Sequence, residues 1–304
     1  MTSGRHAVLV GATASGKSAL AMALARRAPE WELVSVDSMQ VYRGMDIGTA
    51  KPTTGERAEV PHHLLDLLDP WEEGAVAWFQ RQALATIADI EGRGRRALLV
   101  GGTALYVQAI VDELDIPAQY PEVRAELDAE PDTAALHARL QALDPLAADR
   151  MDPANRRRVV RALEVTLGSG RLFSTYGPGL DVHPPTPFTM VGLRRSSDDL
   201  RARIAARYRV QLDAGFLDEV RRLHEDPRGL SRTAAQALGY RELHEHLTAE
   251  VPLDVALDLA VRRTGRFARR QWAWFRRDPR ITWLDLGPGE EANLLVDELA
   301  RTVG

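Results

Sequence analysis

The sequence predicts an α/β protein in which a parallel β-sheet is flanked by helices and interrupted by an inserted all-helical subdomain. Three observations predict this class. Short apolar runs alternate with helical patterns up to residue 111, residues 115–187 show helical patterns without a convincing strand, and strand and helix patterns return afterwards. We therefore expect a discontinuous core formed by residues 1–114 and 188–304, with residues 115–187 as the helical insertion.

The first part of the core shows three strand patterns, each followed by a helical pattern. The strands are expected at 6–10, 33–36 and 97–100, and the helices at 18–27, 75–91 and 105–111. In the helix at 75–91, Phe79, Ala83 and Ile87 recur at steps of four, which is typical of an amphipathic helix. This alternation favours parallel strands, because a parallel pair needs a long crossover connection.

The insertion differs from the core in its sequence pattern. Pro121, Pro131, Pro145 and Pro153 separate short helical patterns there, and residues 169–187 are rich in glycine and proline. The chain is then expected to return to the sheet. The expected elements are a strand at 189–193, helices at 197–213, 216–225 and 253–276, a strand at 281–286 and a closing helix at 290–301.

The composition excludes several classes of protein. The 304 residues include no cysteine, which excludes disulfides, Cys-ligated zinc, iron–sulfur clusters and thiol catalysis. No run of about 18 apolar residues is present, so no membrane-spanning helix is expected. The N-terminus lacks an apolar stretch long enough for a signal peptide. We expect a cytoplasmic, monomeric protein without a membrane partner.

The net charge of −4 excludes a uniformly basic nucleic-acid binder but not a local basic surface. Arginines gather at 156–161 in the insertion and again at 262–280, where Trp272, Trp274 and Phe275 lie between them. Basic residues interleaved with aromatics suit single-stranded RNA loops. The alternative is a solvated helix face with the aromatics in the core.

Only Lys17 and Lys51 among the 39 basic side chains are lysine, and the other 37 are arginine. Lysine has a compact ammonium on a flexible stem, whereas arginine ends in a wide planar fork. A tight loop that needs a point charge could therefore retain lysine against this bias, and chance is the alternative.

Residues 11–18 fit the motif G-x-x-x-x-G-K-[ST] between an apolar strand and a helix, and predict a P-loop NTPase-like sheet. The residues expected to bind a diphosphate or nucleotide are Gly11, Ala12, Thr13, Ala14, Ser15, Gly16, Lys17 and Ser18. Backbone N–H groups would cradle phosphate oxygens, Lys17 would reach the outer phosphates, and the Ser18 hydroxyl would ligate Mg²⁺. The motif leaves open which phosphate ester binds and whether phosphoryl transfer occurs.

Asp37 follows the second expected strand beside the phosphate loop, where α/β sheets place their ligands. A carboxylate there can help to hold Mg²⁺ or accept a proton. The alternative is a cap for the following turn, a role that Asp37 or Ser38 could fill. The residues alone leave both interpretations open.

The run DSMQVYRGMDIGTAKP at 37–52, together with the phosphate loop, resembles the bacterial tRNA dimethylallyltransferases, P-loop enzymes that prenylate N6 of an adenosine beside the anticodon. The resemblance continues in order through nearly the whole chain. Its further segments are PHHLLD (61–66), GGTALY (101–106), NRRRVVRALE (155–164), GFLDEVR (215–221), QALGYR (236–241) and RRQ (269–271).

The resemblance implies transfer of a dimethylallyl group from dimethylallyl diphosphate to N6 of adenosine 37 in the tRNA anticodon stem-loop, with Mg²⁺ as cofactor. It implies catalytic roles for Asp37 as general base, Thr103 beside the bridging oxygen, and Arg221 on the diphosphate. Alternatives are a helix N-cap for Thr103 and a solvated charge for Arg221. The implied tRNA-binding residues are Asp37, Ser38, Met39, Gln40, Thr103, Arg157, Arg158, Val159, Val160, Arg161, Gln236, Ala237, Leu238, Gly239, Tyr240 and Arg241.

Three other functions share some of these features. A P-loop small-molecule or nucleotide kinase would share the loop and Mg²⁺, but no arginine-rich lid typical of such kinases is evident. A prenyltransferase acting on free adenine nucleotides would leave the insertion and the arginine clusters unexplained. A non-enzymatic P-loop module would leave Asp37 and Thr103 unexplained. The main interpretation consumes no ATP, so an ATP-binding assignment would describe the motif and not the donor.

Overall fold

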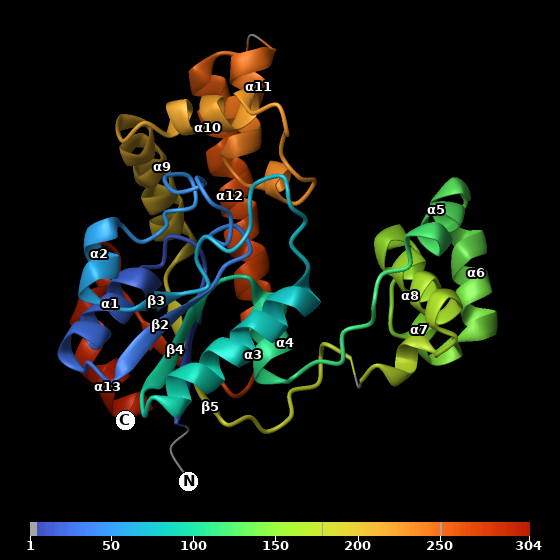
Figure 1. Cartoon of the computed structure of the whole chain (residues 1–304), viewed down its shortest axis with the longest axis horizontal. Coiled ribbons are helices and arrows are strands. Elements are labelled where there is room, and N and C mark those ends of the chain that lie inside the picture. The colour runs from blue at the N-terminus through green and yellow to red at the C-terminus, as the bar shows by residue number, and fades with distance from the viewer. Residues whose placement is uncertain (1–4, 178, 250) are drawn as a thin grey trace. The chain divides into compact units, whose positions relative to one another are not determined.

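The computed structural model describes residues 5–177, 179–249 and 251–304, and Figure 1 shows its cartoon. The chain divides into two compact units. The first unit runs up to Val111 and resumes at Pro185, and the second is Asp112–Pro184. The second unit therefore begins and ends three residues earlier than the insertion expected at 115–187.

The first unit is built on a six-stranded sheet whose paired strands are all parallel. The strands are β1 (His6–Gly11), β2 (Trp31–Val36), β3 (His62–His63), β4 (Arg96–Gly101), β5 (Phe188–Arg194) and β6 (Thr282–Asp285). Their order across the sheet is β3-β2-β4-β1-β5-β6. β1 and β2 are buried along their whole length, as parallel strands covered on both faces are. β3 has two residues and therefore no periodicity, which is why the sequence predicts no strand there.

Helices cover both faces of this sheet (Figure 1). The helices of the first unit are α1 (Lys17–Arg27), α2 (Thr54–Glu59), α3 (Val76–Gly92), α4 (Ala104–Val111), α9 (Ser197–Asp213), α10 (Phe216–Glu225), α11 (Tyr240–Thr248), α12 (Leu253–Phe275) and α13 (Val296–Val303). Along β1, Val8 and Val10 point into one core with Phe79, whereas Ala7 and Leu9 point into a second core. The sheet thus separates two cores, which confirms the predicted α/β class.

The closing helix begins later than the sequence predicts. Residues Ala292–Leu295 form a 3-10 turn, and α13 follows it. Glu290 is kept in a turn because its carboxylate accepts the Gly287 N–H at 2.7 Å and its carbonyl accepts from Arg195 at 2.6 Å. Among the described residues, no helix is long and apolar enough to cross a membrane.

The second unit contains helices and no strand in the part that the structure describes. Its elements are α5 (Pro121–Ala129), α6 (Thr133–Leu143), α7 (Pro145–Asp149), α8 (Arg156–Ser169) and the 3-10 turn η1 (Phe173–Thr175). Pro121 and Pro145 begin α5 and α7, where the missing N–H would have had no helical partner. Asp132 and Asn155 cap α6 and α8, and Leu140 lies in a core of this unit's own. The predicted all-helical insertion is confirmed.

Candidate active site

The phosphate loop joins β1 to α1 and has the backbone that its glycines predict. Gly11 and Gly16 have φ values of 153° and 102°, and a Cβ on Gly11 would lie 2.7 Å from the carbonyl oxygen of Leu193. Gly16 is the N-cap of α1, and no side chain of the described residues caps this helix. The first N–H groups of α1 therefore remain available to an anion. Ser18 is exposed in the first turn.

Two positively charged side chains enclose this loop. Lys17 Nζ donates to the Ala12 carbonyl at 2.8 Å. Burial lowers the pKa of Lys17 to about 8, with nearby Asp37 opposing the shift and Arg207 adding to it. Arg207 on α9 donates from Nη1 to Thr13 Oγ1 at 3.0 Å, and its Nε is buried without a hydrogen-bond partner in the described chain. A buried, unpartnered guanidinium N–H at this loop suits a phosphate oxygen.

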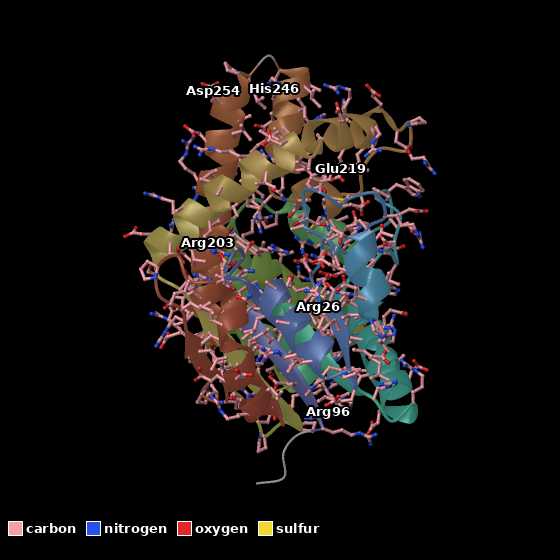
Figure 2. The ribbon with its side chains drawn as sticks, turned by 90° about the vertical axis from the view of Figure 1, so that its left-hand side faces the viewer. Arg26, Arg96, Arg203, Glu219, His246 and Asp254 are labelled. Carbon is pink, nitrogen blue, oxygen red and sulfur yellow. The ribbon has the colours of Figure 1, made fainter. Side chains whose placement is uncertain are left out.

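Two further arginines fix the loop backbone. Arg203 on α9, labelled in Figure 2, donates from Nε to the Ala14 carbonyl at 3.0 Å. Arg195 donates from Nε to the Ser15 carbonyl at 2.7 Å, and its enclosed side chain pairs with Asp199 at 2.7 Å. Both residues therefore hold the shape of the loop through its carbonyl groups.

A buried glutamine connects the loop with the end of β4. Gln271 on α12 is 5% exposed. Its Oε1 accepts the Thr13 N–H at 2.8 Å, and its Nε2 donates to the Gly102 carbonyl at 2.8 Å. The side chain thus bonds the phosphate loop and the segment that leads into Thr103.

Asp37 and Thr103 follow β2 and β4, which are neighbours in the sheet. Asp37 Oδ1 accepts the N–H groups of Met39 at 2.8 Å and Gln40 at 3.4 Å, so it caps the turn after β2. Thr103 Oγ1 accepts the Ser38 N–H at 3.2 Å, which joins the two turns. The Thr103 side chain does not cap α4; its carbonyl accepts the first N–H groups of that helix. The cap of Asp37 uses Oδ1, and Oδ2 accepts no hydrogen bond from the described residues.

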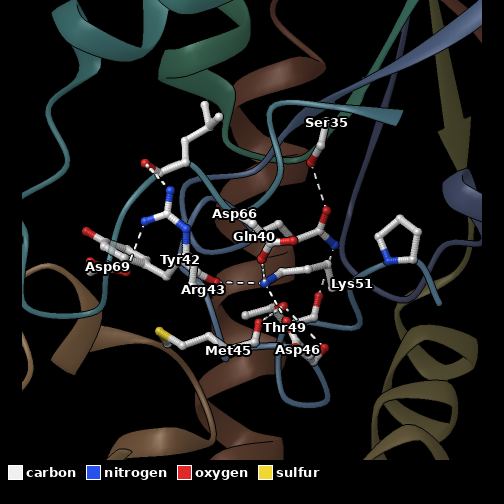
Figure 3. A network of polar contacts seen from close by, with 12 residues as sticks. Ser35, Gln40, Tyr42, Arg43, Met45, Asp46, Thr49, Lys51, Asp66 and Asp69 are labelled. Atoms are coloured by element: carbon white, nitrogen blue, oxygen red, sulfur yellow. Dashed lines mark hydrogen bonds and ion pairs between the residues drawn. The ribbon is translucent and has the colours of Figure 1, made fainter. Parts of the chain in front are cut away.

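The loop after β2 is held from inside by Lys51 (Figure 3). The Lys51 side chain is fully enclosed. Its Nζ donates to the Tyr42 carbonyl at 2.7 Å and pairs with Asp46 at 2.5 Å and Asp66 at 2.7 Å. The three contacts join residues from both ends of the loop to the segment after β3.

Gln40 belongs to the same network (Figure 3). Its Oε1 accepts from Ser35 Oγ at 2.8 Å, and its Nε2 donates to the carbonyls of Thr49 at 3.1 Å and Ala50 at 3.2 Å. The amide of Gln40 is therefore used in folding the loop, and its predicted contact with tRNA competes with these bonds.

Glu219 holds the tip of this loop from α10 (Figure 2). It is 1% exposed and accepts the N–H groups of Asp46, Ile47 and Gly48 at 3.0, 2.8 and 3.1 Å. The Tyr240 hydroxyl donates to the same carboxylate at 2.5 Å. Burial and this carboxylate raise the pKa of Tyr240 well above its ordinary value, so the phenol stays a donor.

The residues predicted to bind tRNA differ in burial. Val159 and Val160 lie in the core of the second unit, and Ala237, Gly239 and Tyr240 are buried in the first. These residues are packed against protein, and their contact with tRNA stays a prediction. The predicted tRNA-binding side chains that are exposed are Arg157, Arg158, Gln236 and Arg241. Arg161 is half-buried, and it pairs with Glu164 and donates to the Pro117 carbonyl.

Among the described residues, no hydrogen bond joins the predicted catalytic arginine to the phosphate loop, and its catalytic role stays a prediction. Arg221 lies on α10, is 44% exposed and pairs with Asp218 one turn away. The arginine that reaches Thr13 is Arg207, on the preceding helix. No local pattern distinguishes Arg207 from the other arginines among the 37 in the chain.

Gln271 is another residue of the site, besides Arg207, for which the sequence analysis predicted no role. The spacing of buried residues along α12 could have indicated it. The buried face of α12 comprises Ala256, Ala260, Thr264, Ala268, Gln271 and Phe275, at steps of three and four. A glutamine on an otherwise small or apolar stripe needs hydrogen-bond partners in the core. That pattern marks it as a residue with specific polar contacts.

A phosphate loop after β1, with a carboxylate and a hydroxyl after two adjacent strands, defines the class of P-loop group-transfer enzymes. Two family models match the chain, IPP transferase over residues 40–278 and isopentenyl transferase over residues 5–66. The chain therefore belongs to the IPP transferase family, and it is a prenyl-transferring enzyme. This confirms the resemblance found in the sequence and argues against the kinase alternative.

The curated relatives align with this chain over nearly the whole length of both proteins. The tRNA dimethylallyltransferase of Nocardioides sp. is 49% identical over 279 residues, which is 91% of this chain and 89% of the relative. The tRNA dimethylallyltransferase of Corynebacterium efficiens is 45% identical over 298 residues, which is 96% of this chain and 98% of the relative.

Two solved structures share the fold. The full-length tRNA isopentenylpyrophosphate transferase of Bacillus halodurans has a TM-score of 0.72 and 37% identity, covering 99% of this chain and 97% of that one. A eukaryotic dimethylallyltransferase acting on tRNA has a TM-score of 0.80 and 25% identity, covering 98% of this chain and 77% of that one. The likeness extends over both units of the chain.

Proposed function

We propose that this protein transfers a dimethylallyl group from dimethylallyl diphosphate to N6 of adenosine 37, beside the anticodon of tRNA, and releases diphosphate. The observation that carries this proposal is the joining of the phosphate loop to the ends of β2 and β4. There an anion-binding site faces a carboxylate and a hydroxyl whose turns are bonded to each other. The names of the relatives agree with this substrate pair.

The donor half of the site, which comprises the phosphate loop with the start of α1 and Arg207, stabilises the leaving group. As the bond between C1 and the bridging oxygen breaks, its electron pair moves to the diphosphate. The N–H groups at the start of α1, Lys17 and Arg207 offset that charge electrostatically. We assign to Arg207 the role that the resemblance implies for Arg221.

Mg²⁺ fits the same half. Magnesium in phosphate sites takes one or two protein oxygens and completes its shell with phosphate oxygens and water. The exposed hydroxyl of Ser18, in the first turn of α1, is one such oxygen. When bound, Mg²⁺ would neutralise part of the diphosphate charge.

The acceptor half of the site, which comprises Asp37 and Thr103, activates N6 of adenine, which is a poor nucleophile. The N6 lone pair of adenine is delocalised into the ring, so the amine must lose a proton as its bond to C1 forms. Asp37 accepts that proton on Oδ2, because Oδ1 is held by the turn. Thr103, held by Ser38, offers its hydroxyl to the departing oxygen.

The tRNA substrate is supported by exposed arginines and by the relatives. Arg157 and Arg158 lie side by side at the start of α8 with exposed side chains, as phosphate contacts require. Arg241 is a third exposed arginine, in the first unit. A free nucleotide would not need any of these side chains.

The test uses labelled dimethylallyl diphosphate, Mg²⁺ and either unmodified tRNA or AMP, with label followed into product. We expect label in tRNA only, and a loss of at least about 100-fold in rate for Asp37→Ala in a protein that stays folded, although loss of the cap by Oδ1 lowers its stability by about 1 kcal/mol. Label in AMP would move the function to free nucleotides. Full activity of a folded Asp37→Ala variant would remove Asp37 as the base.

A further inference from the structure

We infer that Gln271 is a positioning residue that sets the spacing between the diphosphate-binding loop and the acceptor half of the site. The inference rests on the proposed function. The two polar atoms of the Gln271 side chain bond to different parts of the site, one to the phosphate loop and the other to the segment before Thr103. Oε1 accepts the Thr13 N–H, and Nε2 donates to the Gly102 carbonyl, both at 2.8 Å.

The contact to Thr13 fixes the direction of the loop. Thr13 is held twice, through its N–H by Gln271 and through its hydroxyl by Arg207. An amide N–H bonded to a side chain does not turn toward a ligand, so the loop presents its later N–H groups to the diphosphate. The next residue, Ala14, has a φ of 65°, a conformation that a non-glycine residue keeps only when its surroundings enforce it.

The contact to Gly102 fixes the other half. Gly102 is followed by Thr103, whose Oγ1 accepts the Ser38 N–H in the turn that Asp37 caps. A path of hydrogen bonds and short stretches of backbone therefore runs from the phosphate loop through Gln271 to the candidate base. Prenyl transfer requires the amine and C1 to approach within bonding range, so the spacing of the two halves governs the rate.

The amide of Gln271 lies directly against the backbone of Gly102. A Cβ on Gly102 would lie 2.3 Å from Gln271 Nε2 and 3.3 Å from the Gly11 carbonyl oxygen. The close approach exists because residue 102 is glycine. Gly102→Ala should therefore displace the same amide that a substitution of Gln271 removes.

The experiment separates positioning from folding. Gln271→Leu removes both bonds, and we expect a rate of prenyl transfer in a single turnover reduced by about 10- to 100-fold. The Kd for inorganic diphosphate should change by less than about threefold, because Lys17 and the α1 N–H groups remain. Gly102→Ala should reproduce this pattern.

Thr264→Val is the matched control. Thr264 lies on the same buried face of α12, is 1% exposed and bonds to the Tyr208 hydroxyl at 2.8 Å, without contact to the loop. We expect it to lower the unfolding temperature as Gln271→Leu does and to leave the transfer rate within twofold of the wild type.

Gln271→Glu keeps the test decisive if the leucine variant fails to fold. An ionised carboxylate still accepts from Thr13 but faces the Gly102 carbonyl oxygen without a proton, whereas a protonated one restores both bonds. The rate of this variant relative to the wild type should therefore rise at least about threefold from pH 8 to pH 6.

Three outcomes would overturn the inference: a folded Gln271→Leu variant with a rate within twofold of the wild type, a rate loss no larger than the loss of diphosphate affinity, or no recovery of Gln271→Glu at low pH. Failure of the proposed function is recognised separately, because wild-type protein would then transfer no label to tRNA.

Discussion

At the scale of single residues, the two lysines occupy two enclosed positions. Lys17 reaches the Ala12 carbonyl inside the phosphate loop, and Lys51 reaches the Tyr42 carbonyl and two carboxylates inside the loop after β2. A compact ammonium can make such contacts in a space that a planar guanidinium would overfill. This agrees with the interpretation that a tight loop retains lysine in an arginine-rich chain.

The lowered pKa of Lys17 predicts how diphosphate binding depends on pH. A bound anion raises this pKa again, so complex formation takes up a proton. Since the free pKa is about 8, affinity is full below that value and is lost as pH rises through it. Between pH 7 and pH 9 we expect the Kd for inorganic diphosphate to rise up to about tenfold.

Calorimetry at both pH values checks this expectation. Diphosphate itself titrates in this range, so Lys17→Met supplies the baseline. A wild-type Kd that changes with pH no more than that of the variant would contradict the assignment.

The two candidate arginines can be compared directly. Arg207→Leu removes the buried N–H beside the loop, and we expect the rate of transfer to fall about 100- to 1,000-fold. Arg221→Leu removes an exposed pair with Asp218, which we expect to leave the rate within about twofold. Single-turnover rates with tRNA measure both, and the reverse order would return the role to Arg221.

At the scale of elements, the loop after β2 is folded by buried polar contacts. Lys51 closes it from within, and Glu219 binds three successive N–H groups at its tip from α10. Gly48 is required there, because a Cβ would lie 2.2 Å from the Phe216 ring. The long motif is therefore largely a folding motif that positions Asp37 at its start.

Lys51 provides a test of that view. We expect Lys51→Met to lower the free energy of unfolding by about 1–3 kcal/mol, because the Tyr42 carbonyl loses its donor in an enclosed place, whereas Asp66 keeps its pair with Arg57. Lys51→Arg should also destabilise, although it keeps the charge, because the enclosed side chain has no space for a guanidinium.

Urea unfolding measures both variants, and exposed Arg241→Lys is the control for a change of basic side chain. Wild-type stability of Lys51→Arg would show that charge alone matters at this position.

At the scale of the whole molecule, the chain has two units with separate cores. The phosphate loop, Asp37, Thr103 and Gln271 all lie in the first unit. The arginine pair of α8 lies in the second. The residues predicted to bind the diphosphate thus lie in the first unit, and part of those predicted to bind RNA lie in the second.

This division predicts different consequences for the two ligands. Arg158→Ala should weaken tRNA binding and reduce the slope of log K against log salt concentration by up to about one. The Kd for diphosphate should stay unchanged. Fluorescence binding at several salt concentrations measures this, and an unchanged slope would exclude a phosphate contact by Arg158.

The sequence alone was sufficient for the features whose signal is local. The parallel sheet, the all-helical insertion and the phosphate loop each follow from apolar periodicity, proline positions or a fixed glycine–lysine spacing. Asp37 and Thr103 could be placed at strand ends for the same reason, because parallel strands bring their carboxyl ends to one edge.

Only the tertiary structure decided which distant side chains complete the site. Arg207 and Arg221 are both arginines on neighbouring helices, and only packing brings Arg207 to Thr13. The burial of Val159, Val160 and Tyr240 likewise depends on what packs against them. Gln271 joins Thr13 and Gly102 across separations of 258 and 169 residues, a contact that no local pattern encodes. Such contacts arise from the packing of whole elements and therefore become visible only in the folded chain.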